Sequence, residues 1–229
     1  MEEVQYVKET QKEQSGVYSN YNYTVKDFCY KVNKRIWDVL LALAGIIMLS
    51  PVFLIVSIII ICQDGHQPFY VQKRVGKNGR QFGLYKFRSM IVTDKTLEEL
   101  LTPQELEYYR KEFKLENDPR VTKFGKFIRK TSIDELPQLL NILKGDLSVV
   151  GPRPVIQEET LRYGRNREEF LSVKPGLTGY WQAYARNDAD YESGKRQEME
   201  LFYVRNHSFL LDVKIFFKTF EAVIRKTGV

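Results

Sequence analysis

The chain has 229 residues, of which 43% are hydrophobic, a size that allows one ordinary domain with an accessory element. Its formal net charge is +6, so nucleic acid, an anionic membrane face and phosphate-bearing substrates are all open as partners. The only two cysteines, Cys29 and Cys62, lack metal-ligand spacing, which argues against a disulfide framework and favours a reducing cytoplasm.

The first 62 residues predict a flexible arm followed by a membrane segment. Residues 1–25 are polar and lack a sustained apolar period, so we expect a loosely ordered N-terminal arm. Residues 26–62 begin with basic side chains and then become almost wholly apolar, with Asp38 as the only charge after Ile36. A signal peptide fits poorly, because the apolar stretch starts late and lacks a small-residue cleavage site.

Ser50-Pro51 lies near the centre of this apolar segment. Proline removes a helical hydrogen bond and clashes with the preceding turn, so we expect the helix to break there. Lys and Arg flank both ends of the segment, and the positive-inside tendency therefore places both ends in the cytoplasm. We expect a re-entrant helical hairpin; a proline-kinked span is the alternative.

Residues 63–229 are expected to form a small cytoplasmic catalytic domain. Alternating residues on either side of Lys77-Asn78-Gly79 predict a short β-hairpin. Lys86 and Arg88 lie two apart on its second strand and so share one face, which suits an anion site; a solvated strand face is the alternative.

Several amphipathic helices are expected beyond the hairpin. Leucines at near-helical intervals predict two short surface helices within residues 94–117. Residues 121–130 mix apolar and basic side chains, which predicts an interfacial helix; a nucleic-acid patch is the competing interpretation, and we expect no nucleic-acid partner. Residues 158–170 are expected to be helical, residues 174–182 to form a turn leading into an aromatic strand, and residues 208–226 to form a helix that packs on the core or lies on the membrane.

The central stretch, residues 129–141, carries two adjacent carboxylates, Asp134 and Glu135. Ser132 can cap a helix that begins within residues 132–134 and ends at Gly145, with Pro137 tolerated in the first turn. The carboxylates would then lie at the positive end of a helix dipole, where phosphate also binds. Arg129, Lys130 or a divalent metal would offset the repulsion between carboxylate and phosphate. The alternative is an ordinary capping box of Ser132 and Glu135.

Two further segments are candidates for ligand binding. Arg153 lies between two prolines, which holds its backbone extended and suits bidentate phosphate recognition. Asn187-Asp-Ala-Asp190 has the form of the Asp-x-Asp signature of many glycosyltransferases, but no strand pattern precedes it. The expected fold class is thus α+β and mainly helical: a membrane re-entrant helical hairpin and a catalytic domain with a short β-hairpin and interfacial amphipathic helices.

Several motifs occur together in a characteristic order. They are Lys86-Phe-Arg-Ser-Met90, Asp118-Pro-Arg120, Arg129-Lys-Thr-Ser-x-Asp-Glu-Leu-Pro-Gln138, Asn141-x-Leu-Lys-Gly-Asp146, Val150-Gly-Pro-Arg-Pro154, Lys174-Pro-Gly-Leu-Thr-Gly179 and Asp212. This set resembles the bacterial sugar transferase family, the monotopic phosphoglycosyl transferases, over about residues 31–226.

The resemblance implies an enzyme at the cytoplasmic face of the bacterial cell membrane. It would transfer a phospho-sugar from a UDP-sugar to polyprenyl (undecaprenyl) phosphate with release of UMP, and so initiate glycan assembly. The resemblance implies Asp134 as nucleophile, Glu135 as Mg²⁺ ligand, and Lys86, Arg129 and Arg153 as phosphate-binding residues.

Ser50-Pro51 falls on the family's helix-breaking pair, and Glu200 stands where the family commonly has Asp. No block of further membrane helices precedes Lys31, so we expect a minimal member. Membrane lipid is an expected partner, and assembly into a homo-oligomer is a further possibility that the sequence leaves undecided.

Two other functions compete with this expectation. A conventional glycosyltransferase acting through Asp188 and Asp190 would release UDP instead of UMP. A membrane-anchored interaction module that binds anionic lipid would retain its function in Asp134→Asn. The identity of the sugar is not encoded in any motif quoted above.

Overall fold

The computed structural model describes residues 25–112, 115, 118–185, 189 and 191–224. The expected N-terminal arm and most of the Asn187-Asp-Ala-Asp190 motif lie outside the described residues. The chain divides into two compact units between Ile36 and Trp37. The described residues of the first unit form the start of helix α2 (Val25–Asp64), and the second unit contains the elements discussed below.

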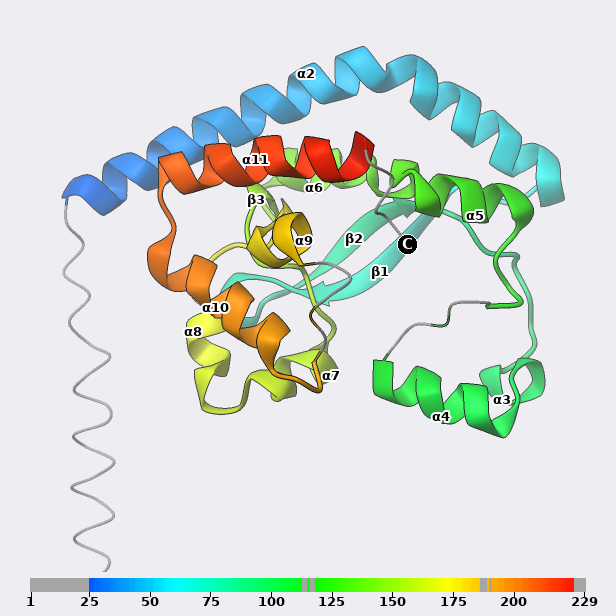
Figure 1. Cartoon of the computed structure of the whole chain (residues 1–229). Coiled ribbons are helices and arrows are strands. Elements are labelled where there is room, and N and C mark those ends of the chain that lie inside the picture. The colour runs from blue at the N-terminus through cyan, green and yellow to red at the C-terminus, as the bar shows by residue number, and fades with distance from the viewer. Residues whose placement is uncertain (1–24, 113–114, 116–117, 186–188, 190, 225–229) are drawn as a thin grey trace, which may run out of the picture. The chain divides into compact units, whose positions relative to one another are not determined.

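Helix α2 is long, apolar and bent. Its segment Phe28–Asp64 is long and apolar enough to cross a membrane. The helix remains continuous through Pro51, and Figure 1 shows that it bends near its middle. Ser50 Oγ donates to the Ile47 carbonyl at 2.9 Å, so the hydroxyl bonds to the backbone just before the bend. The predicted apolar helix is therefore confirmed, and its re-entrant path stays a prediction.

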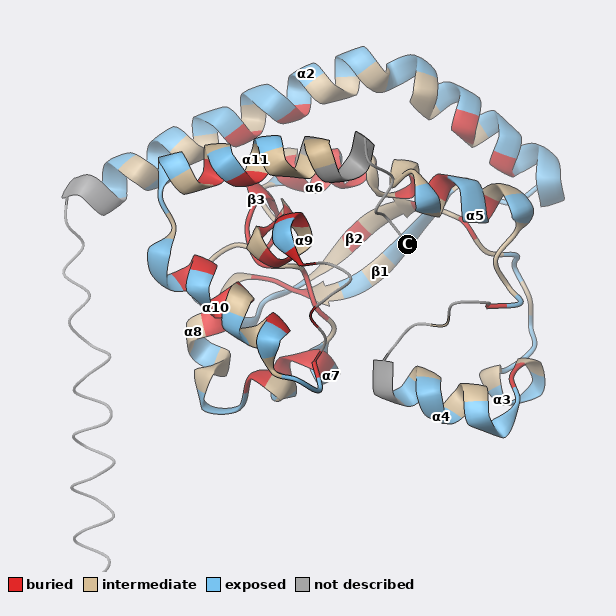
Figure 2. Ribbon diagram, viewed as in Figure 1, coloured by how far each residue is buried: buried red, intermediate tan, exposed pale blue. Residues whose placement is uncertain are grey.

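One side of α2, from Trp37 onwards, packs on the rest of the second unit. Ala42 is buried in the main core, and Val56 and Ile60 are buried in a cluster with Phe87. Asp38 is also buried, and its Oδ1 accepts hydrogen bonds from Ser148 Oγ at 2.9 Å and the Val149 N–H at 2.8 Å. Figure 2 shows that much of the helix is otherwise exposed.

The predicted β-hairpin is confirmed. Strands β1 (Phe69–Val75) and β2 (Gln81–Phe87) pair antiparallel with Phe69 opposite Phe87, and the turn η1 (Lys77–Gly79) joins them. Asn78 has φ of 56°, a left-handed conformation that asparagine tolerates better than most residues. The alternation on either side of this turn therefore gave the correct pairing.

The expected surface helices are present as α3 (Leu97–Leu100) and α4 (Pro103–Glu112). Thr102 caps α4, because its N–H and hydroxyl donate to Glu105 and its Oγ1 accepts from the Glu105 N–H. The two helices predicted over these segments are present as α5 (Lys123–Lys130) and α11 (Phe209–Ile224), and the interfacial position of α5 stays a prediction. Helix α11 packs on the core through Ile215, while Leu210 and Phe217 are exposed.

Two predicted elements were wrong. The helix expected over residues 158–170 is divided into α7 (Gln157–Thr160), η3 (Leu161–Asn166) and α8 (Arg167–Leu171), because Gly164 has φ of 50° and interrupts it. The expected aromatic strand is helix α9 (Tyr180–Tyr184), preceded by β4 (Gly176–Thr178), which pairs in parallel with β3 (Ser148–Val150). Helix α10 (Lys195–Asn206) follows α9 in the chain.

Candidate active site

Asp134 and Glu135 lie on a single 3-10 turn, η2 (Ile133–Glu135), ahead of helix α6 (Gln138–Lys144). The predicted start of an α-helix at residues 132–134 was therefore wrong. Pro137 has no N–H to donate to the Ile133 carbonyl, and that carbonyl accepts from the Leu136 N–H instead, at 3.1 Å. The predicted C-terminal cap at Gly145 is confirmed, with φ of 88°.

Ser132 does not cap a helix as predicted, and it does not form the capping box of the alternative interpretation. Its φ is 57°, a left-handed conformation, and its side chain makes no capping hydrogen bond. Non-glycine residues rarely adopt this conformation, and such residues cluster at functional sites. The backbone at Ser132 turns the chain from α5 into the carboxylate-bearing turn.

The two carboxylates differ in their surroundings. Asp134 is buried, with 8% of its surface exposed, whereas Glu135 is partly exposed. Glu135 Oε1 lies 3.2 Å from Lys86 Nζ, and both side chains are largely covered. This ion pair joins the η2 turn to strand β2.

A small hollow is lined by both members of this ion pair. Its polar lining includes Lys86, Glu135 and Arg153, which are three of the predicted site residues, and its other lining residues are Arg74, Leu84, Gln138, Pro154, Leu177 and Gln182. The Arg153 N–H donates to the buried Glu200 carboxylate at 3.1 Å, which holds the backbone of the Pro-Arg-Pro segment. Three cations and one carboxylate thus surround one small space, an arrangement that favours a bound anion.

The remaining predicted phosphate ligands do not line this hollow. Arg129 Nε donates to Ser89 Oγ at 2.8 Å. Arg88 is the residue that follows the end of β2. Its Nη2 donates to the Asp64 carboxylate at the end of α2 at 2.6 Å, and its Nε donates to the Gln67 carbonyl at 2.9 Å. In this structure Arg88 therefore joins the hairpin to the end of α2.

The donor set at Asp134 and Glu135 fits the way proteins bind Mg²⁺. That ion uses one or two carboxylates, completed by water and substrate phosphates, instead of a full cage of protein ligands. Within the described ranges there is no group of three or more His, Cys, Asp or Glu side chains that could hold a metal. The paired carboxylates thus suit a metal that arrives with a phosphate substrate.

Arg74 is a site residue that sequence reasoning missed. It lines the hollow from β1, and its Nη1 lies 3.1 Å from Oε2 of the buried Glu159. Tyr70 pairs with Lys86 and Arg74 with Phe82, so Arg74 and Lys86 are on the same face of the hairpin. A prediction of the register of the two strands would have shown that these two cations share one face of the hairpin.

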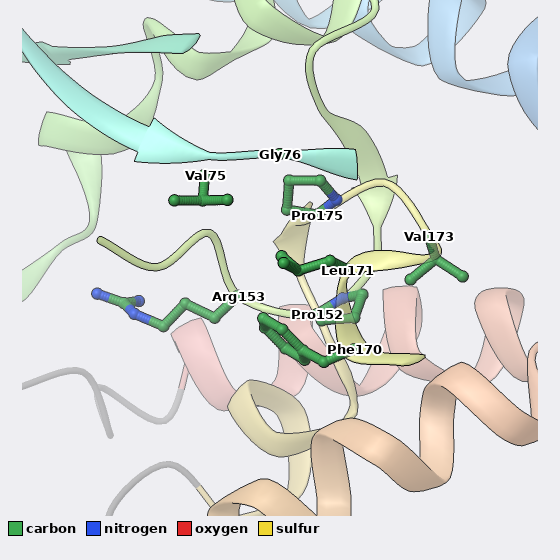
Figure 3. Close-up of a pocket in the computed structure, with 8 residues that line it drawn as sticks. All are labelled: Val75, Gly76, Pro152, Arg153, Phe170, Leu171, Val173 and Pro175. Atoms are coloured by element: carbon green, nitrogen blue, oxygen red, sulfur yellow. The ribbon is translucent and has the colours of Figure 1, made fainter. Parts of the chain in front are cut away.

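A second pocket also includes Arg153 in its lining. Figure 3 shows its lining, which is apolar apart from Arg153: Val75, Gly76, Pro152, Arg153, Phe170, Leu171, Val173 and Pro175. The Arg153 guanidinium extends away from the apolar side chains. This pocket therefore lacks the polar groups that would orient a ligand.

The fold and the site define an α+β protein in which an apolar helix packs on a domain that contains a hollow lined by three cations and one carboxylate. Comparison with known families identifies this class further. The model of the family described as "Bacterial sugar transferase" matches residues 29–226, and the chain belongs to that family.

Relatives extend this result. The chain is 46% identical over 198 residues to the UDP-galactose-lipid carrier transferase of Erwinia amylovora and 44% identical over 198 residues to the undecaprenyl-phosphate galactose phosphotransferase of Salmonella typhimurium. These alignments cover 85% of this chain and 41% of each relative, so the chain spans about two fifths of their length. It is also 44% identical over 200 residues to the exopolysaccharide production protein ExoY of Sinorhizobium fredii, covering 86% of this chain and 88% of that protein.

Proposed function

We propose that this protein is a phosphoglycosyl transferase that moves a phospho-sugar from a UDP-sugar to polyprenyl (undecaprenyl) phosphate and releases UMP. The observation that carries the proposal is the convergence of Lys86, Arg74, Arg153 and Glu135 on one hollow. Asp134 is not among the lining residues, but it precedes Glu135 on the same η2 turn. The names of the relatives, which include a UDP-galactose-lipid carrier transferase and an undecaprenyl-phosphate galactose phosphotransferase, support this class of substrates.

In the first half-reaction an Asp134 carboxylate oxygen attacks the phosphorus that bears the sugar. An oxygen–phosphorus bond forms, the anhydride bond to the uridine-bearing phosphate breaks, and UMP leaves with the electron pair. Lys86 and Arg153 lie where they would neutralise the charge that moves onto the departing phosphate. The product is an aspartyl phospho-sugar.

In the second half-reaction a phosphate oxygen of the polyprenyl phosphate attacks the same phosphorus. The acyl–phosphate bond breaks, the phospho-sugar passes to the lipid carrier, and the Asp134 carboxylate is regenerated. Each substrate brings its phosphate to the same hollow in turn, so one set of cations serves both steps.

Glu135 is the residue that would hold Mg²⁺ next to the Asp134 nucleophile, and the ion would supply further neutralisation of the phosphate charge. In the present structure Glu135 pairs with Lys86. Lys86 therefore holds the Glu135 carboxylate at the hollow that both side chains line.

We further propose that α2 enters the bilayer from the cytoplasmic face, turns back at the bend near Pro51, and leaves the bilayer again on the cytoplasmic face. Its apolar composition and the basic residues at both ends support this placement. The acceptor is a lipid, and the apolar helix would keep the hollow near the surface at which the phosphate of that lipid lies.

The test is nucleotide release by detergent-solubilised full-length protein with Mg²⁺, polyprenyl phosphate and a panel of UDP-sugars. We expect UMP from one donor, and a loss of about 10³-fold or more in Asp134→Asn because the nucleophile is removed. Asp94→Asn changes an exposed carboxylate outside the hollow and is the matched control. UDP as product, or full activity in Asp134→Asn, would contradict the proposal.

A second measurement separates the covalent route from direct transfer. With labelled UMP, a UDP-sugar and no lipid acceptor, a covalent intermediate predicts exchange of label into the UDP-sugar. The exchange should be lost in Asp134→Asn and retained in Asp94→Asn. UMP release that requires the acceptor, with no exchange, would argue for direct transfer.

A further inference from the structure

The hollow beside Glu135 contains an excess of positive charge. Arg74, Lys86 and Arg153 line it, and Glu135 is the carboxylate among its lining residues. Burial, followed by the charge of Arg153, lowers the pKa of Arg74. Glu135 pairs with Lys86 and Glu159 with Arg74, but the lining itself holds three cations and one carboxylate, so a bound anion of high charge would stabilise the cations further.

Arg74 is fixed at the hollow by neighbours on several segments. Its Nη1 donates to Glu159 Oε2 at 3.1 Å and to the Pro154 carbonyl at 3.3 Å, and its Nη2 donates to Gln72 Oε1 at 2.8 Å. Glu159 in turn accepts from the Tyr191 hydroxyl at 2.9 Å. The guanidinium is therefore oriented before any ligand arrives, which reduces the entropy lost on binding.

This orientation also leaves hydrogen-bonding capacity on Arg74. A guanidinium has five N–H donors, and the three bonds above leave the Nε–H and one Nη2–H unused. Nε is buried and has no hydrogen-bond partner. A buried donor without a partner is costly and marks a position that a ligand can satisfy.

We propose that Arg74 is a further phosphate-binding residue of this site, which contributes a fixed positive charge to the diphosphate of the donor. The inference rests on the proposed function for the identity of the ligand, and on the hollow itself for the binding of a diphosphate. Glu159 holds Arg74 in place, and Arg74 also contacts the carbonyl next to Arg153.

The test measures binding of UDP and of inorganic pyrophosphate to the detergent-solubilised full chain by titration calorimetry, at one fixed Mg²⁺ concentration. The variants are Arg74→Lys, Arg74→Gln and the double variant Arg74→Gln/Glu159→Gln. The double variant removes the charges of Arg74 and Glu159 together, and Arg196, which also lies 3.9 Å from Glu159, keeps the buried Glu200 as a neighbouring carboxyl. Arg80→Gln is the control, because Arg80 is an exposed cation at the turn of the same hairpin.

We expect both ligands to bind about 10- to 100-fold more weakly in the double variant, the loss typical of a charged hydrogen bond. The affinity of Arg74→Lys for both ligands should lie between those of the double variant and wild type, because lysine keeps the positive charge but lacks the planar, forked donor group of the guanidinium. Arg80→Gln should stay within about twofold of wild type, since an exposed charge contributes little.

Each outcome decides one of the two proposals. A folded double variant that binds both ligands as wild type does would overturn the role of Arg74, as would wild-type protein that binds neither. Arg74-dependent binding of pyrophosphate without binding of UDP would support the role of Arg74 and contradict the nucleotide-sugar function.

Discussion

Glu200 is a fully buried carboxyl whose proton is coupled to folding. Burial raises its pKa from 4.5 to about 7, although Arg196 and the N–H of Arg153 act in the opposite direction. The native carboxyl therefore keeps its proton to higher pH than the unfolded one. Its contribution to stability is fully present below about pH 4.5 and is lost as the pH rises to about 7.

We therefore expect the free energy of unfolding of the wild type to fall across this window by an amount on the order of 3 kcal/mol from Glu200. Glu200→Gln keeps an acceptor for the Arg153 N–H but cannot ionise, so its stability should change less over the same range. Denaturant unfolding in detergent at pH 5 and pH 7.5 measures both. An equal decline in the two proteins would show that other groups cause it.

Single residues also explain where sequence reasoning about the site succeeded and where it failed. Lys86, Glu135 and Arg153 were predicted from local motifs, and the structure brings them together. Arg74 belongs to no local chemical pattern, because its position depends on the register of β1 against β2. The prediction that Ser132 caps the helix was wrong. Pro137 has no N–H, so α6 begins only after it, and the helix propensities of the neighbouring residues do not show this delay.

At the scale of elements, Asp38 is the side chain that ties α2 to β3. It accepts from Ser148 Oγ and the Val149 N–H within the buried interface between the two elements. Asp38→Ala would leave both donors without this acceptor, and we expect a loss of roughly 2–5 kcal/mol in the free energy of unfolding. Thermal unfolding of the detergent-solubilised protein provides the measurement.

Asp38→Asn is the matched variant for this prediction. It keeps an oxygen at the same position and should lose less than half as much stability as Asp38→Ala. If the alanine variant unfolds at the wild-type temperature, Asp38 does not hold α2 on the domain.

Elements with a strong period were the ones that the sequence predicted correctly. The hairpin alternates with a period of two, and α11 has an apolar face at helical spacing. The segments over residues 157–184 are short, and their conformation depends on tertiary contacts, such as the parallel pairing of β3 with β4. Tyr180 and Trp181 favour strands by propensity, yet they lie in α9, where Trp181 is buried.

At the scale of the whole molecule, the native cysteines provide a test of how α2 meets the membrane. Cys29 and Cys62 lie toward opposite ends of α2, and both are exposed. We expect a membrane-impermeant maleimide to label both single-cysteine variants, Cys29→Ser and Cys62→Ser, in inside-out vesicles but not in intact spheroplasts. Both ends of a re-entrant helix face the cytoplasm.

A spanning helix gives a different pattern in the same experiment. One variant would then label in spheroplasts and the other in inside-out vesicles, and the re-entrant proposal would fail. Labelling of both after detergent solubilisation confirms that each thiol is reactive.

The buried side chain of Asn141 has a consequence for the solubility of the folded protein. Its Nδ2 donates to the Gly83 carbonyl at 2.7 Å, and its Oδ1 accepts from the Tyr85 N–H at 2.9 Å. One amide thereby occupies the backbone groups on the side of β2 away from β1, as a residue of a third strand would. An open strand edge is a template for pairing with other chains, so this side chain protects the hairpin from edge-to-edge aggregation.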